Sequence, residues 1–360
     1  MRYDAFVLVS FGGPERAEDV QPFLANVTRG RGVQPERLAE VAEHYLSVGG
    51  VSPINDQCRR LLRGIGDELA AHGVDLPLYW GNRNWHPLLA ETLRRMSADG
   101  VRRALAFVTS PYGSYSSCRQ YLDDIATARA ALGPDAPAVD KIRHYADDPG
   151  FVQPQVDAVR AALATLEAAR RATTRLVFTA HSIPVSMAAT AGPDGGRYEA
   201  QLRETAALVA AGAAPDLGWD LVWQSRSGPP SVPWLEPDVN DHLTALAGTG
   251  VTGVVVSPIG FISDHLEVAW DLDTEAATTA KRLGLGFARA ATAATDPRFV
   301  AMVRRLVVER LTGSGPRDRL GATEVWDTCP THCCPAPRRD RRPQPRPARQ
   351  PAPGGGSTPA

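Results

Sequence analysis

The sequence has little net charge, few cysteines and no long apolar run. Its 39 basic and 40 acidic residues nearly cancel, so no overall basic field would draw nucleic acid to it. It contains no run of about 18 apolar residues, which excludes a helical membrane span. With only five cysteines, and a start that enters a strand at Phe6 without a leader segment, we expect a cytoplasmic protein whose thiols stay reduced.

What the chain does have is a regular alternation of short apolar runs and helix-like periodic segments. Strands are predicted at 6–10, 76–81, 104–109, 175–180, 219–224, 253–257 and 285–290, with helices between them. This alternation is typical of parallel sheets with helices on both faces. We therefore predict an α/β fold with two domains, 1–149 and 150–315, and a ligand cleft between them. A Cys-rich segment follows at 316–335, and then a Pro/Arg/Gly tail at 336–360, which has too few apolar side chains to order itself.

An acidic stripe follows one of the predicted strands. Val254–Val256 indicate a buried strand, and Asp264 with Glu267 has the spacing of a capping box for the next helix. Glu267, Asp271 and Glu275 recur every four residues, so they share one helical face. Such a stripe is either a solvated surface or a row of oxygen ligands for a divalent cation. Its start at the carboxyl end of a strand favours the ligands.

A single histidine marks the end of another strand. His181 follows the run 175–180, and Pro184 disfavours a helix directly after it. A lone histidine is commonly structural, but the carboxyl end of a strand in an α/β sheet is where ligands bind. His181 is therefore the candidate for proton transfer or metal binding.

The first predicted strand leads into a glycine-containing turn. Gly12 and Gly13 lack the G-x-G-x-x-G spacing of a dinucleotide site, but they allow a flat ligand to approach the backbone. Farther along, Arg29 and Arg31 lie in a loop and suit the carboxylates of an anionic ligand. Exposed loop charges explain these two arginines equally well.

Three cysteines lie close together near the end of the sequence. Cys329, Cys333 and Cys334, with His332 among them, indicate a metal site in a reducing compartment. Zinc could use the three thiolates and the histidine, whereas an iron–sulfur cluster needs four thiolates, the fourth of which Cys118 could supply. The spacing leaves zinc, iron–sulfur and free thiols open.

Taken together, five blocks of the sequence resemble the ferrochelatase family. The blocks are Phe11-Gly12-Gly13-Pro14, Gly49-Gly50-Val51-Ser52-Pro53, Thr179-Ala180-His181-Ser182-Ile183-Pro184, Trp223-Gln224-Ser225 and Gly260-Phe261-Ile262-Ser263-Asp264-His265-Leu266-Glu267. They occur in order within roughly residues 3–312. The resemblance implies two Rossmann-like, chelatase-type domains and the insertion of ferrous iron into a porphyrin.

The resemblance also implies the site. His181 would be the proton acceptor or metal ligand, with Glu267 opposite it across the porphyrin. Asp271 and Glu275 would then form an acidic ladder that passes iron in or protons out. The residues implied to bind the porphyrin are Phe11, Arg29, Arg31, Ser52 and Tyr121. Phe11 stands where related bacterial enzymes carry a tyrosine ligand, so an axial oxygen ligand from that position is excluded.

The Cys-Pro-x-x-Cys-Cys ending resembles the actinobacterial members of the family. It implies a [2Fe-2S] cluster held by Cys118, Cys329, Cys333 and Cys334, and coproporphyrin III as the substrate that receives Fe²⁺. We expect a monomer. The alternatives are a ferrochelatase for protoporphyrin IX, a cobalt or nickel chelatase for sirohydrochlorin, and a haem or iron carrier without turnover.

Overall fold

The computed structural model describes residues 3–29, 33–313 and 317–337. Eight strands form two sheets: β1 (Ala5–Ser10), β2 (Leu78–Asn82), β3 (Arg103–Val108), β4 (Ala138–Lys141), β5 (Thr174–His181), β6 (Trp219–Gln224), β7 (Gly253–Ser257) and β8 (Gly286–Arg289). The α-helices are α1 (Val20–Val27), α2 (Pro35–Ser47), α3 (Ile54–Ala71), α4 (Leu89–Ala98), α5 (Gln120–Leu132), α6 (Pro149–Thr165), α7 (Ala168–Arg171), α8 (Val185–Ala189), α9 (Arg197–Ala213), α10 (Val239–Leu246), α11 (Leu266–Val268), α12 (Ala277–Arg282) and α13 (Pro297–Thr312). Short 3₁₀ turns lie at Ala17–Asp19 and Gly133–Asp135, and π-helical turns at Tyr115–Arg119 and Ala269–Ala276.

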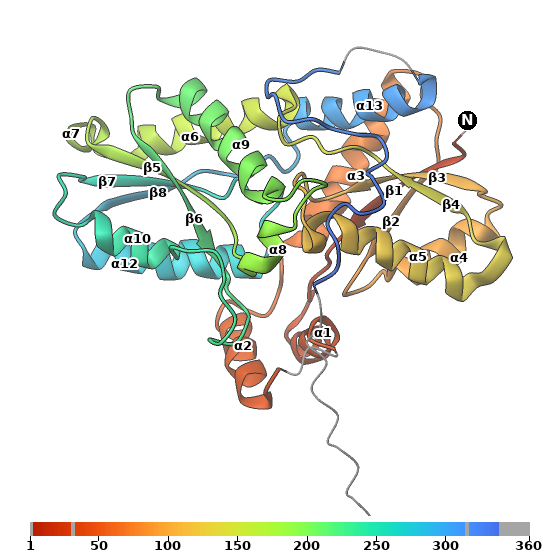
Figure 1. Ribbon diagram of the computed structural model, residues 1–360, viewed down its shortest axis with the longest axis horizontal. Helices are drawn as coiled ribbons and strands as arrows, with labels where there is room; N and C mark the ends of the chain where they lie inside the picture. The colour runs from red at the N-terminus through yellow and green to blue at the C-terminus, as the bar shows by residue number, and fades with distance from the viewer. Residues whose placement is uncertain (1–2, 30–32, 314–316, 338–360) are drawn as a thin grey trace, which may run out of the picture.

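Both sheets are parallel and have the same topology. Their strand orders are β2-β1-β3-β4 and β6-β5-β7-β8, and they lie on opposite sides of the view in Figure 1. In each sheet, the second strand of the chain is added on one side of the first strand, and the third strand is added on its other side. At such a switch point the loops at the carboxyl ends of two neighbouring strands diverge and leave room for a ligand. The predicted α/β fold with two parallel sheets is confirmed.

The inner strands of the two sheets, β1, β3, β5 and β7, are buried on both faces because each face packs against its own helix layer. In β1, Phe6 and Leu8 belong to the central core, whereas Val7 and Val9 pack with α4 and α5. Each fully buried side chain of this kind contributes about 1.5–3 kcal/mol through loss of water contact. The consequence is the near-continuous apolar run that predicts such strands in the sequence.

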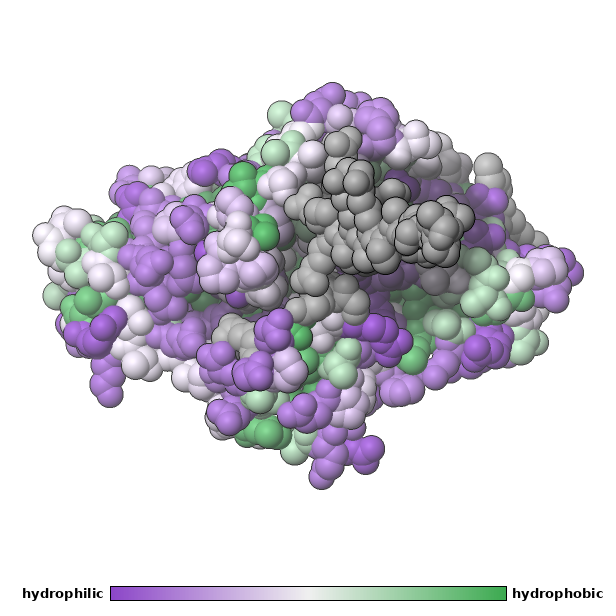
Figure 2. Space-filling model, turned by 60° about the horizontal axis from the view of Figure 1, so that its bottom comes forward, coloured by the Kyte–Doolittle hydropathy of each residue, from purple (hydrophilic) through white to green (hydrophobic). Residues whose placement is uncertain are grey.

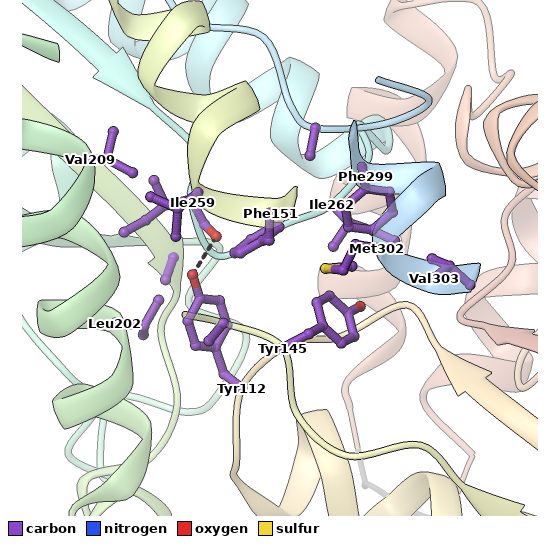
Figure 3. Packing of buried hydrophobic residues seen from close by; sticks show 14 of the residues in the cluster. Tyr112, Tyr145, Phe151, Leu202, Val209, Ile259, Ile262, Phe299, Met302 and Val303 are labelled. Carbon is purple, nitrogen blue, oxygen red and sulfur yellow. Dashed lines mark hydrogen bonds between the residues drawn. The ribbon is translucent and has the colours of Figure 1, made fainter. Parts of the chain in front are cut away.

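The central core joins the two halves of the chain. It combines residues on the inner faces of both sheets with residues of α3, α6, α9 and α13. The last helix, α13, packs on both α3 and α6, and Arg304 in α13 pairs with Glu68 of α3 at 2.8 Å. Figure 3 shows Tyr112 of the first half donating its hydroxyl to the carbonyl oxygen of Ile259 in the second half, at 2.8 Å. The two sheets are therefore held by one continuous packed interior.

One strand was not predicted, and most of the C-terminal tail lies outside the described residues. Strand β4 was not predicted, because its four half-buried residues include Asp140 and Lys141 and so lack an apolar run. Of the tail 336–360, only residues 336 and 337 are among those described. Within the described ranges, no helix has the length and apolar character needed to cross a bilayer.

Helices α1 and α2 protrude from one end of the molecule (Figure 1). Figure 2 brings this end forward and shows apolar atoms among hydrophilic ones there. Leu46, Val48 and Val51, at and just beyond the end of α2, are large apolar residues that remain exposed. Helix α2 forms one wall of the site described next.

Candidate active site

The carboxyl ends of β5 and β7 bring His181 and Glu267 together. β5 ends at His181, and β7, its parallel neighbour, runs into the loop that leads to Glu267 in α11. His181 Nε2 lies 3.9 Å from Glu267 Oε2, and the two side chains are 34% and 40% exposed. Both groups are therefore within reach of a substrate.

The expected placement of Glu267 opposite His181, across the porphyrin, is wrong. A gap of 3.9 Å between Nε2 and Oε2 admits a proton or a metal ion but no planar macrocycle. The reason is topological, because β5 and β7 are adjacent strands of one sheet and their loops leave the same edge. The imidazole and the carboxylate therefore lie side by side, and a macrocycle has to lie over both.

The backbone fixes the orientation of the His181 ring. Nδ1 of His181 is 2.5 Å from the carbonyl oxygen of Ser182. A carbonyl oxygen can only accept a hydrogen bond, so Nδ1 carries the ring proton. In the neutral ring, Nε2 then presents its lone pair toward the space shared with Glu267.

Helix α2 places two of its residues beside the His181–Glu267 pair and the helical turn that follows it. The hydroxyl of Tyr45 donates to Oε1 of Glu267 at 3.5 Å, and the rings of His44 and Trp270 stack with 4.6 Å between their centres. Burial, together with the charge of Glu267, raises the pKa of Tyr45 well above its usual value. Tyr45 therefore remains a neutral hydrogen-bond donor to the carboxylate.

The acidic stripe lies on the π-helical turn Ala269–Ala276 and its flanks. π-Helical turns are rare and occur frequently at functional sites. Asp271 accepts hydrogen bonds from the Ser225 hydroxyl and from Nε2 of Gln224, the latter at 3.2 Å. Burial raises the pKa of Asp271 to about 7, with the charges of Glu267 and Glu275 adding to it and the Ser225 hydrogen bond opposing it. Asp271 thus exchanges a proton near neutral pH.

The three carboxylates of the stripe line a cavity rather than a plain solvated surface. The cavity has a volume of about 240 Å³ and lies between α2, the loop 225–227 and the π-helical turn. Glu267 and Asp271 are half-buried, and Glu275, which accepts a 2.9 Å hydrogen bond from Trp270, is exposed. The stripe therefore runs from the His181 pair to solvent, as a row of ligands would.

His265 also belongs to this site, although it was not among the predicted site residues. Its ring lies edge-on to Phe261 with 5.1 Å between centres, and loss of solvent, with the nearby His181, lowers the pKa of His265 to about 3. His265 is therefore neutral. Its place two residues before Glu267, in the same loop after β7, is the signal in the sequence that could have identified it.

The predicted helix cap at Asp264 is wrong. Residue His265 occupies the N-cap position of α11, with φ of −136°. Both oxygens of Asp264 instead accept hydrogen bonds from the guanidinium of Arg289, at 3.1 and 3.2 Å. An ion pair with the neighbouring strand β8 replaces the cap, which spacing alone could not show.

The residues implied to bind the porphyrin lie mainly around the end of β1. Phe11 is half-buried, and its ring centre is 6.3 Å from that of Phe23. Ser52 is buried against Gly13, where an added Cβ would lie 2.7 Å from the Ser52 Cβ. This close approach requires glycine at position 13.

Tyr121 and the two arginines are placed differently. Tyr121 is 4% exposed, beneath Arg83, whose guanidinium carbon is 4.5 Å from the tyrosine ring centre and 5.9 Å from that of Phe11. Arg83 thus connects Phe11 to Tyr121, a role that the sequence did not reveal. Arg29 is exposed, and Arg31 lies outside the described residues.

The C-terminal segment brings the predicted cysteine ligands toward one another. Sγ of Cys333 and Sγ of Cys334 are 3.6 Å apart, and the backbone N–H of Gly192 donates to Sγ of Cys334 at 3.1 Å. Hydrogen bonds from the thiols of Cys118 and Cys333 lower the pKa of Cys329. Cys118, which precedes α5, therefore contacts the C-terminal cysteines across more than half the sequence.

These thiols are not arranged as a finished metal centre. Across the described ranges, no group of three or more His, Cys, Asp or Glu side chains has a geometry that could hold a metal ion. All five cysteines are free thiols, and Cys58 is buried in α3, away from the C-terminal segment.

Comparison with known proteins decides the family. The sequence profile of the ferrochelatase family matches residues 3–311. The chain belongs to the ferrochelatase family. Among its relatives, proteins named coproporphyrin III ferrochelatase from Nocardia farcinica and Mycolicibacterium smegmatis are each 56% identical to this family member. The matches cover 94% and 88% of this chain, and 98% and 92% of the relatives.

The fold agrees with a second group of chelatases. SirB from Bacillus subtilis, in a structure with Fe³⁺, superposes with a TM-score of 0.52 at 11% identity, covering 87% of this chain and 97% of SirB. This likeness shows a shared fold and confirms two chelatase-type domains in this ferrochelatase family member.

Proposed function

We propose that the protein inserts Fe²⁺ into coproporphyrin III and releases Fe-coproporphyrin III for haem biosynthesis. The observation that carries the proposal is the His181–Glu267 pair, exposed at the switch point of the second sheet and continued by Asp271 and Glu275. The choice of porphyrin is supported by the names of the relatives that are 56% identical over nearly the whole chain.

The reaction requires a base and a metal route. Insertion of Fe²⁺ into a porphyrin releases the two protons of its pyrrole N–H groups. His181 can accept one of them at Nε2, because the hydrogen bond to Ser182 keeps the proton of the neutral ring on Nδ1. Glu267, 3.9 Å away, can take the second proton or hold the ion before transfer.

The placement of this pair determines how the macrocycle would lie. Because His181 and Glu267 are neighbours on one wall, they act on the same face of the porphyrin. Asp271, with its pKa near 7, and exposed Glu275 then form a route from solvent for hydrated iron or for departing protons. Phe11, Ser52, Tyr121, Arg29 and Arg31 remain the candidates for contact with the macrocycle and its carboxylates.

We also propose that Cys118, Cys329, Cys333 and Cys334 hold a [2Fe-2S] cluster. Four sulfur donors suit this cluster, which supplies one-electron redox chemistry. Lys141 and Arg197 lie close enough for their positive charges to act on these thiols, and these two charges offset part of the charge of four thiolates. We also propose that the protein acts as a monomer in the cytoplasm, where thiols such as these stay reduced.

An anaerobic turnover assay tests the proposal. The full-length protein is mixed with Fe²⁺ and an excess of coproporphyrin III, protoporphyrin IX or sirohydrochlorin, and the metallated product is followed by absorbance. We expect many turnovers with coproporphyrin III. Faster turnover with protoporphyrin IX or sirohydrochlorin would identify one of those as the substrate, and one equivalent of product followed by none would indicate a carrier.

A further inference from the structure

The carbonyl group of His181 is held by a buried tyrosine. The hydroxyl of Tyr198, in the first turn of α9, donates to the His181 carbonyl oxygen at 2.9 Å. Tyr198 is 4% exposed, and its ring is stacked on Trp223 and edge-on to Tyr112, with centres 5.9 and 6.4 Å away. The tyrosine is thus a fixed donor that touches the backbone of His181 and not the cavity.

This hydrogen bond controls where the imidazole lies. The peptide that joins His181 to Ser182 contains the carbonyl that Tyr198 holds, and Ser182 supplies the carbonyl that anchors Nδ1. The N–H of the same peptide, which belongs to Ser182, donates to the carbonyl oxygen of Gln224 at 2.8 Å. A rotation of the His181–Ser182 peptide would therefore move Nε2 relative to Glu267. Tyr198 and Gln224 together oppose that rotation.

The residue before Tyr198 faces the C-terminal segment, residues 317–337. Arg197, which is 9% exposed, donates through Nη2 to the carbonyl oxygen of Glu324, and its guanidinium carbon is 4.3 Å from the ring centre of Trp326. Cation–π contacts of this kind contribute about 0.5–2 kcal/mol. Two successive residues at the start of α9 therefore contact His181 and the C-terminal segment.

The C-terminal segment is itself fixed to both halves of the protein. Arg319 pairs with Asp147 of the first half at 2.7 Å, and Oε1 of Glu204 in α9 accepts hydrogen bonds from the N–H groups of Ala322 and Thr323 at 2.6 and 3.2 Å. Figure 1 shows the segment crossing the front of the molecule after α13. Because these contacts hold the segment in place, the segment in turn fixes the position of the Arg197 guanidinium.

We propose that Tyr198 is a positioning residue for His181, and that Arg197 makes this position depend on the C-terminal segment. The inference rests on the proposed role of His181 in iron insertion. Tyr198 does not contact the porphyrin, so loss of its hydroxyl affects the chemical step and leaves porphyrin binding unchanged.

The variant Tyr198→Phe tests the first part, with Tyr145→Phe as the matched control. Tyr145 is 2% exposed, and its hydroxyl donates to the carbonyl oxygen of Val108, at the end of β3 in the other sheet, at 2.9 Å. Each substitution removes a buried hydroxyl that donates a hydrogen bond to a backbone carbonyl oxygen, so both should lower Tm by a similar amount. Because small displacements of a reacting group are costly, we expect Tyr198→Phe alone to lower kcat about 10-fold, with KM for coproporphyrin III unchanged.

A spectroscopic measurement separates positioning from general destabilisation. In protein labelled with ¹⁵N-histidine, the His181 signals, assigned by their absence in His181→Ala, should shift in Tyr198→Phe and stay in place in Tyr145→Phe. Equal kcat values and unmoved His181 signals in the two tyrosine variants would overturn the positioning role.

The second part is tested by a double-mutant cycle with Trp326→Leu in the full-length chain. In the wild-type background, loss of the Trp326 ring beside Arg197 should lower kcat about 3-fold, a loss worth roughly 0.65 kcal/mol, and in the Tyr198→Phe background it should have little further effect. Equal losses in both backgrounds would disprove the link through Arg197.

His181→Ala distinguishes the inference from the proposed function. If His181→Ala is inactive while Tyr198→Phe behaves like Tyr145→Phe, the positioning inference fails and the proposed function stands. If His181→Ala turns over normally, the role of His181 in the proposed function fails, and the inference fails with it.

Discussion

Replacing Ser225 with glycine tests the electrostatics of Asp271, and with it the role of the acidic stripe. The Ser225 hydroxyl donates to the Asp271 carboxylate and so favours its charged form, while burial and neighbouring carboxylates raise the pKa to about 7. Glycine is a better replacement than alanine because Ser225 has φ of 59°, in the left-handed region that glycine adopts without strain.

The size of the effect follows from the contacts of Asp271. A hydrogen bond to a charged group contributes about 1.5–3 kcal/mol, and one pKa unit corresponds to about 1.4 kcal/mol, so full loss would raise the pKa by about 1–2 units. The Gln224 amide stays 3.2 Å from the carboxylate, and water can enter beside it. We therefore expect the lower end of the range, an increase of about 1 unit.

The consequence for the rate has a definite sign. A protonated Asp271 neither binds iron nor accepts a proton, so the rate falls as pH drops through its pKa. With that pKa raised from about 7 to about 8, the charged fraction at pH 7 falls about 5-fold and recovers above about pH 9. The loss at pH 7 should therefore be reversible by base.

The assay is the pH dependence of kcat/KM for Fe²⁺ between about pH 6 and 9. Ser225→Gly should move the acid limb to higher pH and leave the rate at high pH close to that of the wild type. Asp271→Asn is the control, because in that variant the limb assigned to Asp271 should be absent. A limb that stays in place in Ser225→Gly, or moves to lower pH, refutes this account of Asp271.

The other predictions concern the base, the metal route, the cysteines and acid stability. His181→Ala should abolish iron insertion while coproporphyrin III still quenches protein fluorescence on binding; near-normal turnover would contradict it. Glu267→Gln should raise KM for Fe²⁺, since it removes a ligand charge beside His181; an unchanged iron dependence would count against the stripe as the metal route. Purified protein should show the visible charge-transfer absorbance of a [2Fe-2S] cluster, and Cys333→Ser should lose it; colourless wild-type protein with stoichiometric zinc would overturn the assignment. Burial alone would raise the pKa of Asp220, but the hydrogen bond and charge of Arg175 outweigh burial, and the pKa is lowered. The charged carboxylate therefore stabilises the fold at pH values above the unfolded pKa of about 4. This contribution is lost as the pH falls from there through the lower pKa of the folded state. Asp220→Asn should therefore reduce the drop in Tm between neutral and acid pH, and an identical drop would show that the ion pair has no such role.

The sequence predicted most of what the two sheets require. Runs such as Val254–Val256 identify strands because both faces of a parallel sheet are buried, and His181 was placed correctly at the carboxyl end of such a strand. The four-residue spacing of Glu267, Asp271 and Glu275 predicted a shared face, which the structure places along a cavity. Local patterns of this kind are sufficient because each depends on neighbouring residues alone.

What the sequence did not reveal depends on contacts between distant residues. The closeness of His181 and Glu267 requires the strand order, and the contact of Tyr198 with His181 requires the packing of α9 against β5. Asp264 has the spacing of a cap, but Arg289 from the next strand competes for it and forms the stronger interaction. The place of His265 two residues before Glu267 marks it as a neighbour of the site, but its neutral state depends on its surroundings in the fold.

The most direct test of the account is a crystal structure of the protein with coproporphyrin III bound. If His181 and Glu267 act side by side, the macrocycle should lie over both on one face, with His181 Nε2 about 3 Å from a pyrrole nitrogen. A macrocycle that lies between the two side chains, or binds with its nitrogens away from His181, would contradict the central claim.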